Sequence, residues 1–313
     1  MSRSTPRSGP RTVALLLAVP LALTACGGSA ADEPAEAVAS ADPAFPVTVT
    51  GDDGELTLDA QPETIVSMSA SATEMLFAIG AGDQVEAVDS TSNFPEDAPV
   101  TDLSAFTPNA EAIAGYEPDL VVLSDDLNGV VDALDALEVP TLLLTGAESL
   151  DDSYEQIETL GDATGHADGA ADVVADVQDR IEAAVASVPD DVEGMRVYHE
   201  LDPSLYSAGS GTFIGGVYAL FGLENIADEA ADAAGGYPQL SAEYVVGQAP
   251  DLVVLADTVC CDQSAEALAQ RPAFDTVPAV EEGRVLEVND DIASRWYPRV
   301  ADFAEQVAGV LQD

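Results

Sequence analysis

A pattern of 13 residues occurs twice in the chain and constrains the fold more than any other feature. It covers residues 111–123 and 243–255, and both copies end in Pro-Asp-Leu-Val-Val-Leu. A helix that stops at Gly115 or Gly247, a Pro-Asp turn and a fully apolar strand are typical of a sheet covered on both faces. We therefore expect two lobes that share one α/β construction.

The rest of the chain supports this fold class. Further strands are expected at residues 64–68, 85–88, 141–144, 196–199 and 284–288. Helical segments separate them, so both sheets should be mostly parallel. Residues 149–187 form helical stretches that break near 161–165, and the second stretch has one apolar stripe, which is formed by Val173, Val174, Val177, Ile181, Ala184 and Val185. A long helix should therefore bridge the lobes and limit their closure to a small hinge motion.

The first 25 residues have the composition of an export signal. Arg3, Arg7 and Arg11 precede the apolar residues 13–23, which are too few to span a bilayer, since a spanning helix needs ~20. The Leu-Thr-Ala-Cys run at 23–26 resembles the lipobox of bacterial lipoproteins, which implies a lipid on Cys26. The alternative is an ordinary secretory signal with an incidental cysteine.

We expect a signal peptide at 1–25, a flexible tether at 26–46, an N-terminal lobe at 47–150, a bridging helix at 151–190 and a C-terminal lobe at 191–313.

The charge of the chain excludes one class of partner. It has no lysine, and the mature part has six arginines against 58 carboxylates, a net charge of −52. Such a surface repels phosphate backbones, so nucleic-acid binding is excluded. A hydrophobic fraction of 47% indicates a folded body in spite of the charge. The acidic excess also suggests adaptation to high salt.

Five short motifs, in a fixed order, carry a family resemblance. They are Ile-Val-Ser-Met-Ser-Ala-Ser-Ala-Thr-Glu-Met-Leu-Phe at 65–77, Ser-Asn-Phe-Pro at 92–95, Pro-Asp-Leu-Val at 118–121, Gly-Leu-Glu-Asn-Ile at 222–226 and Arg-Trp-Tyr-Pro-Arg at 295–299. From about Pro62 to its end, the chain resembles the substrate-binding proteins of ABC importers for metal chelates. The resemblance implies two lobes joined by a helical backbone, a monomer, no catalysis, and delivery of a chelate to a permease dimer with its ATPase. In that family, acidic residues matching Glu74 and Glu224 pair with permease arginines, one in each lobe, as exposed ion pairs.

The candidate ligand-binding residues lie on turns and loops. Ser69 and Ser71 follow the strand expected at 64–68. Ser71 or Thr73 can cap the next helix, which should end at Gly80. Aromatic residues on expected loops are candidates for stacking on a flat ligand, and they are Phe94, Phe106, Tyr206, Tyr237, Trp296 and Tyr297. By the resemblance, Phe94, Tyr206, Asp291 and Arg295 match corrin-contacting positions of the family's cobalamin binder. We expect a corrinoid first, a ferric siderophore second and haem third; Arg295 could also bind an anionic ligand.

Metal and cysteine chemistry leave some alternatives open. His199 is expected near the cleft beside Glu200 and Asp202, but one histidine is too few for a bare zinc or manganese ion, so we expect no resident cofactor or metal site. Cys260 and Cys261 are adjacent, closer than usual for a disulfide, and both a bridge and free thiols remain possible.

Two rival functions are a metal-dependent extracellular hydrolase that uses His199, Glu200 and Asp202, and a ligand sensor without a role in transport.

Overall fold

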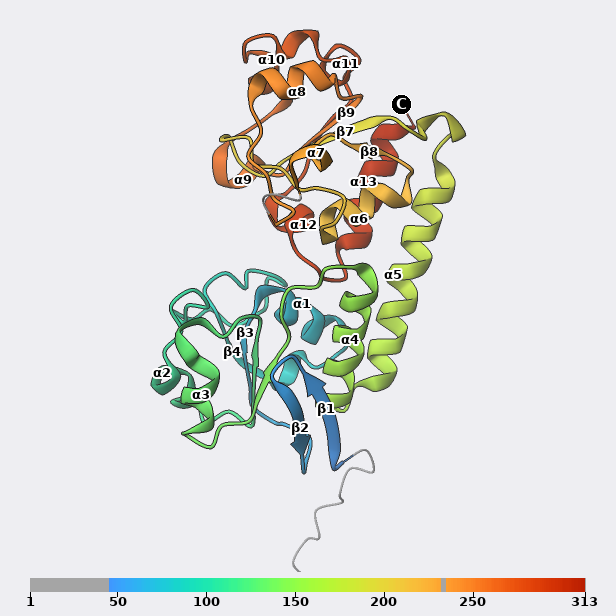
Figure 1. Cartoon of the computed structure of the whole chain (residues 1–313). Helices are drawn as coiled ribbons and strands as arrows, with labels where there is room; N and C mark the ends of the chain where they lie inside the picture. Colours follow the sequence, from blue (N-terminus) through green and yellow to red (C-terminus); the bar gives the residue numbers. More distant parts are fainter. Residues whose placement is uncertain (1–44, 232–234, 313) are drawn as a thin grey trace, which may run out of the picture. The chain divides into compact units, whose positions relative to one another are not determined.

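The computed structural model describes residues 45–231 and 235–312, which belong to one compact unit with two α/β lobes (Figure 1). Cys26, the signal peptide and most of the expected tether lie outside the described residues. Each lobe contains its own four-stranded sheet, and the two copies of the repeat lie in different sheets. The two-lobed organisation expected from the repeat is therefore confirmed.

The sheet of the N-terminal lobe is entirely parallel, in agreement with the expectation of a mostly parallel sheet. Its strands, in the order β4-β3-β5-β6, are β3 (Ile65–Met68), β4 (Val85–Val88), β5 (Leu120–Leu123) and β6 (Thr141–Leu143). Every residue of β3 and β5 is buried. This follows from their composition, because a strand covered by helices on both faces has no polar side to present to water.

Different elements cover the two faces of this sheet. One apolar core joins it to α1 (Ala70–Ala78) and to an antiparallel hairpin of β1 (Val47–Gly51) and β2 (Gly54–Leu58). The other joins it to α2 (Ala110–Ala114) and α3 (Val130–Asp135). The hairpin was not expected from the sequence. The N-cap of α1 also differs from expectation, since the hydroxyl of Ser69, not that of Ser71 or Thr73, accepts a hydrogen bond from the amide of Ala72. The helix ends just before Gly80.

Two long helices follow the first lobe, α4 (Leu150–Thr164) and α5 (Ala167–Ser187). They are separated at Gly165, which has a φ of 76°, so the break falls within the expected segment. A capping box between Ser149 and Asp152 starts α4. The buried stripe of α5 packs on α4, on α1 of the first lobe and on α13 (Val300–Leu311) of the second, which makes α5 the bridging helix.

The C-terminal lobe repeats the parallel sheet with the order β10-β9-β7-β8. Its strands are β7 (Arg196–Glu200), β8 (Glu224–Asn225), β9 (Leu252–Leu255) and β10 (Val285–Glu287). Its helices are α6 (Phe213–Leu220), α7 (Asp228–Ala231), α8 (Ala242–Gln248), α9 (Thr258–Cys261), α10 (Ala265–Ala269), α11 (Pro278–Glu281), α12 (Asp290–Ser294) and α13. The expected stop of α8 at Gly247 is wrong by one residue, because Gln248 is still helical and Ala249 takes the left-handed conformation.

Within residues 45–231 and 235–312, no helix is both long and apolar enough to cross a membrane. In each lobe the parallel strands end together at one edge of their sheet. Turns at such an edge expose amide groups and helix N-termini, which is where open α/β sheets bind ligands.

Candidate ligand-binding site

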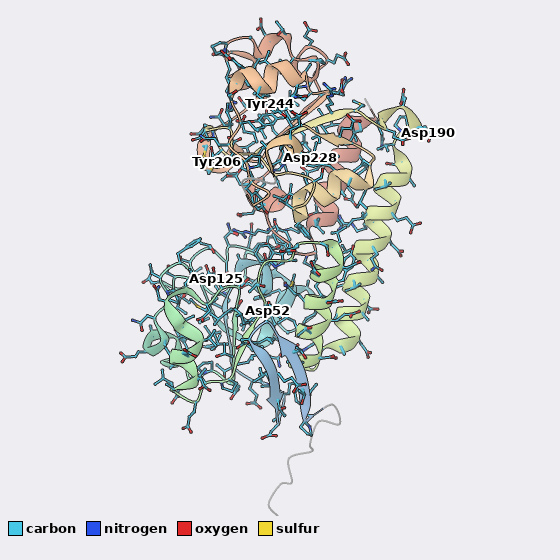
Figure 2. The ribbon with its side chains drawn as sticks, in the orientation of Figure 1. Asp52, Asp125, Asp190, Tyr206, Asp228 and Tyr244 are labelled. Carbon is cyan, nitrogen blue, oxygen red and sulfur yellow. A yellow bond between two sulfur atoms is a disulfide. The ribbon has the colours of Figure 1, made fainter. Side chains whose placement is uncertain are left out.

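The first cavity lies at the carboxyl edge of the N-terminal sheet and has a volume of about 380 Å³. The turns after β3 and β5 contribute Ser69, Ser71 and the pair Ser124–Asp125; Figure 2 shows Asp125 on the N-terminal lobe. Arg295 and Trp296, from the C-terminal part of the chain, complete its wall. Of the predicted ligand-binding residues, this cavity brings together Ser69, Ser71, Phe106, Arg295 and Trp296.

A second cavity of about 320 Å³ shares Gly146 and Trp296 with the first. Its other walls come from residues 146–148 of the first lobe and from the start of α6 and Tyr237 of the second. Trp296 therefore stands between two adjoining hollows, and both lobes contribute to the cleft that they form. Phe106 and Tyr237 are 72% and 44% exposed, so each offers a free aromatic face at one end of this cleft.

Trp296 is held at this boundary by neighbours from the N-terminal side of the chain. Its indole Nε1 donates to Oε1 of Gln156 on α4 at 3.0 Å. A Cβ placed on Gly146 would lie 3.4 Å from the ring, so the backbone at Gly146 lies close to the indole. The ring therefore lies between both apolar cores, and it packs against each of them.

Arg295 lines the first cavity but has protein partners for its charge. Its guanidinium donates to Thr91 O and to Asn93 Oδ1, both at 3.2 Å, and pairs with Asp291 at 2.5 Å. Asn93 in turn donates to Asp291 at 2.8 Å. Asp291 and Arg295 thus form a neutral pair that links α12 to the loop after β4.

Glu74 differs from the exposed carboxylate that we expected. Its side chain is 2% exposed, and its two oxygens accept from Nε and Nη2 of Arg299 at 2.7 and 2.6 Å. Burial raises the pKa of Glu74 above its ordinary value, although the guanidinium of Arg299 acts in the opposite direction. Glu224, at the start of β8, is exposed as expected. It lies at the amino end of its strand, whereas Glu74 follows the carboxyl end of β3.

Three aromatic candidates lie outside the two cavities. Phe94 stacks on the guanidinium of Arg299 at 3.9 Å from its ring centre, and it lines a different hollow beside α5. Tyr206 is 41% exposed in a bridge to Gln239. Tyr297 is fully buried, and its hydroxyl donates to Asp291 O, so the expectation that it faces the cleft is wrong.

His199 is a core residue, contrary to the expectation that it lies near the cleft. It is fully buried, its Nδ1 bonds to the hydroxyl of Tyr218 at 2.6 Å, and Phe303 packs against its ring edge-on. Burial lowers its pKa to about 3, so the ring is neutral. Across residues 45–231 and 235–312, no group of three or more histidine, cysteine or carboxylate side chains is placed to hold a metal ion.

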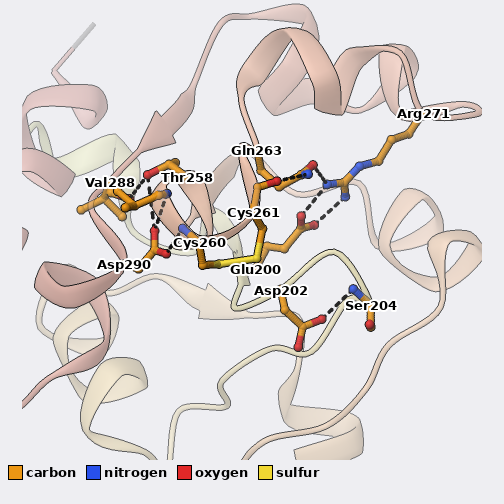
Figure 3. The surroundings of a disulfide bond; sticks show 11 residues. Glu200, Asp202, Ser204, Thr258, Cys260, Cys261, Gln263, Arg271, Val288 and Asp290 are labelled. Carbon is orange, nitrogen blue, oxygen red and sulfur yellow. Dashed lines mark hydrogen bonds and ion pairs between the residues drawn. A yellow bond between two sulfur atoms is a disulfide. The ribbon is translucent and has the colours of Figure 1, made fainter. Parts of the chain in front are cut away.

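A buried polar cluster lies at the carboxyl edge of the C-terminal sheet (Figure 3). Glu200, at the end of β7, accepts hydrogen bonds from both Nη atoms of Arg271, at 2.6 and 2.5 Å. The nearby Cys260 and Cys261 are joined by a disulfide, which settles the open alternative for these two residues. Because Glu200 is fully buried and paired with Arg271, and His199 is also buried, the arrangement does not support the hydrolase hypothesis.

Several cleft residues were not among the predicted ones. The polar pair Ser124–Asp125 directly follows the apolar strand of the first repeat, a position at which parallel strands end, so a stricter use of that rule could have found it. Gly146 and Gln156 gave no comparable signal, because their role depends on where Trp296 lies. Arg299 was part of a quoted motif, but nothing local indicated its partner.

The cleft between two α/β lobes, braced by a helix and walled by aromatic and hydroxyl side chains, defines a two-lobed substrate-binding protein. Comparison with known proteins agrees with this class. A model of the family described as "Periplasmic binding protein" matches residues 65–292. The chain belongs to this family, and it is a substrate-binding protein of an ABC importer and not an enzyme.

Individual relatives cover most of the chain. A protein of Halobacterium salinarum named "Cobalamin-binding protein" is 32% identical over 96% of this chain and 84% of its own. The Bacillus subtilis protein named "Uncharacterized ABC transporter substrate-binding lipoprotein YvrC" is 28% identical over 96% of both. The crystal structure of the vitamin B12 binding protein BtuF of Vibrio cholerae superposes with a TM-score of 0.67 at 25% identity, covering 80% of this chain and 96% of that one.

Proposed function

We propose that the protein captures a corrinoid in the cleft and delivers it to an ABC permease. The observation that carries this proposal is the pairing of Arg295 with Asp291, because it leaves the described cleft without an unpaired cation. A neutral ligand with amide side chains suits serine hydroxyls and aromatic faces better than an anionic ligand does. The Halobacterium relative, whose name states cobalamin binding, supports the same ligand class.

A ferric siderophore is the second candidate and haem the third. The observation that favours them is that Arg295 lines the cavity with 16% of its side chain exposed. An anionic ligand group could take bidentate hydrogen bonds from this guanidinium, but it would have to displace Asp291. Because displacing Asp291 from Arg295 costs free energy, binding of either anionic ligand is less favourable than binding of a neutral one.

The lipid anchor and permease docking belong to the same proposal. A lipid on Cys26 is supported by the Leu-Thr-Ala-Cys run and by the lipoprotein name of the Bacillus relative, and a diacylglyceryl mass on a peptide that begins at Cys26 would test it. Docking through one carboxylate in each lobe is supported by the exposure of Glu224. For Glu74 it requires that Arg299 first release the carboxylate, since both oxygens are taken.

Titration of the intrinsic fluorescence tests the ligand. Trp296 is the single tryptophan of the chain and walls both cavities, so any change in indole emission reports on the cleft. We expect cobalamin to quench this emission to a plateau at one equivalent, and a ferric siderophore panel and haem to quench it less. Free tryptophan amide, titrated in parallel, corrects for light that the coloured ligands absorb. Saturable quenching by haem or a siderophore, and not by cobalamin, would reverse the order of candidates.

A further inference from the structure

Residues 295–299, here called the crossing segment, link α12 to α13 in the C-terminal part of the chain but are bound to residues of the N-terminal part. Arg295 donates to the loop after β4, at Thr91 O and Asn93 Oδ1. Trp296 donates to Gln156 on α4. Together with Arg299, whose contact is described next, three side chains of this five-residue stretch have partners that precede it by at least 140 positions, which fixes its position relative to both lobes.

The third contact, from Arg299 to Glu74, is the most buried. Both carboxylate oxygens accept from the guanidinium at 2.7 and 2.6 Å, and Arg295 lies 3.7 Å from the same carboxylate. The side chains of Glu74 and Arg299 are only 2% and 18% exposed. The rings of Phe94 and Tyr297 lie 3.9 and 4.8 Å from the guanidinium carbon and cover it. Water therefore competes poorly for this pair, and its geometry is well defined.

The N-terminal lobe offers no other cation that could neutralise Glu74 in place of the crossing segment. No arginine or lysine occurs between positions 12 and 179, so the N-terminal lobe has no cation of its own. The two guanidinium groups at Glu74 both come from the crossing segment. A buried carboxylate without a partner is costly, so Glu74 keeps Arg299 in place as much as Arg299 neutralises Glu74.

The crossing segment also forms the wall that the two cavities share. Arg295 lines the first cavity and Trp296 lines both. We propose that Glu74 and Arg299 are positioning residues for ligand binding, which clamp the crossing segment onto the N-terminal lobe and so hold Arg295 and Trp296 in the cleft. This inference rests on the proposed function, because it takes Arg295 and Trp296 to contact a ligand that is bound in the cleft.

The test compares this pair with a more exposed arginine–carboxylate pair, whose side chains are 33% and 47% exposed and whose arginine also pairs with Asp302. Arg180 on α5 makes a bidentate pair with Glu305 on α13 at 2.8 Å for both contacts, away from the two cavities. We would prepare the full chain as Glu74→Gln, as Arg299→Lys and as the double variant Glu74→Gln/Arg299→Met, with Arg180→Met/Glu305→Gln as the control. The double variants remove both charges at once, so neither leaves a buried charge unpaired and folding is preserved.

Two readouts separate positioning from stability. Without ligand, we expect the Trp296 emission of Glu74→Gln and of its double variant to shift to longer wavelength and to be quenched more by acrylamide. With cobalamin, we expect their affinity to fall about tenfold, the size expected for losing a charged hydrogen bond. Arg299→Lys keeps the charge and one hydrogen bond and should recover part of both effects. The control pair should lower the melting temperature without changing either readout.

Equal acrylamide quenching in the Glu74 variants and the control would overturn the proposed positioning role. If the wild-type protein binds none of the three ligands, the proposed function fails, and the quenching comparison still decides whether the pair positions Trp296. The two proposals can therefore fail separately.

Discussion

Asp257 is the residue whose environment is most unusual. It follows β9 at the carboxyl edge of the sheet, is fully buried, and within the described part of the chain neither of its carboxyl oxygens has a hydrogen-bond donor. Arg271 lies nearby but its two Nη atoms are directed to Glu200 (Figure 3). Burial, and then the charge of Glu200, raise the pKa of Asp257 to about 7. The guanidinium of Arg271 thus pairs with only one of two buried carboxyls, Glu200, and the other, Asp257, holds a proton near neutral pH.

This arrangement predicts a pH dependence of stability. The folded protein keeps a proton on Asp257 up to about pH 7, whereas the unfolded chain loses it near the ordinary aspartate pKa of 3.8. Because the folded state binds more protons between these two values, the free energy of unfolding should fall as pH rises from about 4 to about 7, by at most ~1.4 kcal/mol per pH unit. Urea unfolding across this range, on wild type and Asp257→Asn, measures the effect as a difference.

The variant provides its own control, because both proteins share all other titrating groups. We expect Asp257→Asn to be the more stable protein at pH 8 and to lose this part of the pH dependence. Parallel curves for the two proteins from pH 4 to pH 8 would show that Asp257 is ionised in the folded state throughout.

At the scale of elements, close helix packing brings the N-terminal lobe against the bridging helix. Gly169, in the first turn of α5, faces the last residues of α1, and a Cβ there would lie 2.2 Å from the carbonyl oxygen of Ile79. A Cβ on Gly161 of α4 would lie 2.5 Å from the Cβ of Ala170 on α5. Such small residues let backbones approach where a side chain would separate them. The contact of α5 with α1 and α4 therefore depends on these positions and not on the apolar stripe alone.

Two glycine substitutions in helices should have opposite effects. Gly169→Ala forces α5 away from α1 and should destabilise the protein by ~1–3 kcal/mol, the usual cost of overpacking. Gly309→Ala, on α13, meets no atom within 4 Å and should stabilise it by ~0.5–1 kcal/mol, because alanine is the better helix former. Denaturant unfolding at fixed salt compares both with wild type. A stabilising Gly169→Ala would contradict the described packing of α1 on α5.

At the scale of the whole molecule, charge is the dominant property. Acidic side chains project from both lobes (Figure 2), and the mature chain has six arginines against 58 carboxylates. Five of these arginines, Arg180, Arg271, Arg284, Arg295 and Arg299, already form ion pairs. Most carboxylates therefore have no counter-charge within the protein, and their mutual repulsion opposes the compact state.

Salt should relieve this repulsion. The screening length falls from ~10 Å at 0.1 M to ~3 Å at 1 M ionic strength, so the melting temperature should rise with sodium chloride over this range. Sucrose at equal osmolality is the control, because it acts on hydration without screening charge. A melting temperature that is the same at low and high salt would show that the acidic surface does not limit stability.

The sequence by itself determined the repeated unit, the two parallel sheets and the bridging helix. These follow from local patterns, since an all-apolar strand must be covered on both faces and a 3.6-residue stripe must pack. It also placed Ser69, Ser71, Phe106, Arg295 and Trp296 among the ligand-binding candidates, and the structure brings them to one cavity. Ser69 and Ser71 could be placed because residues at strand ends of a parallel sheet meet at one edge. Phe106 and Trp296 were candidates as aromatic residues on expected loops, and Arg295 was a candidate through the family resemblance.

Only the tertiary structure decided which charges pair and which aromatics are buried. Glu74 and Arg299 are 225 positions apart, and no local pattern records that they meet. The same reason explains why Tyr297 is buried while its neighbour Trp296 walls the cleft, and why His199 lies in the core. Ion pairing and burial depend on where separate elements come together, whereas strand and helix formation depend on neighbours in the chain.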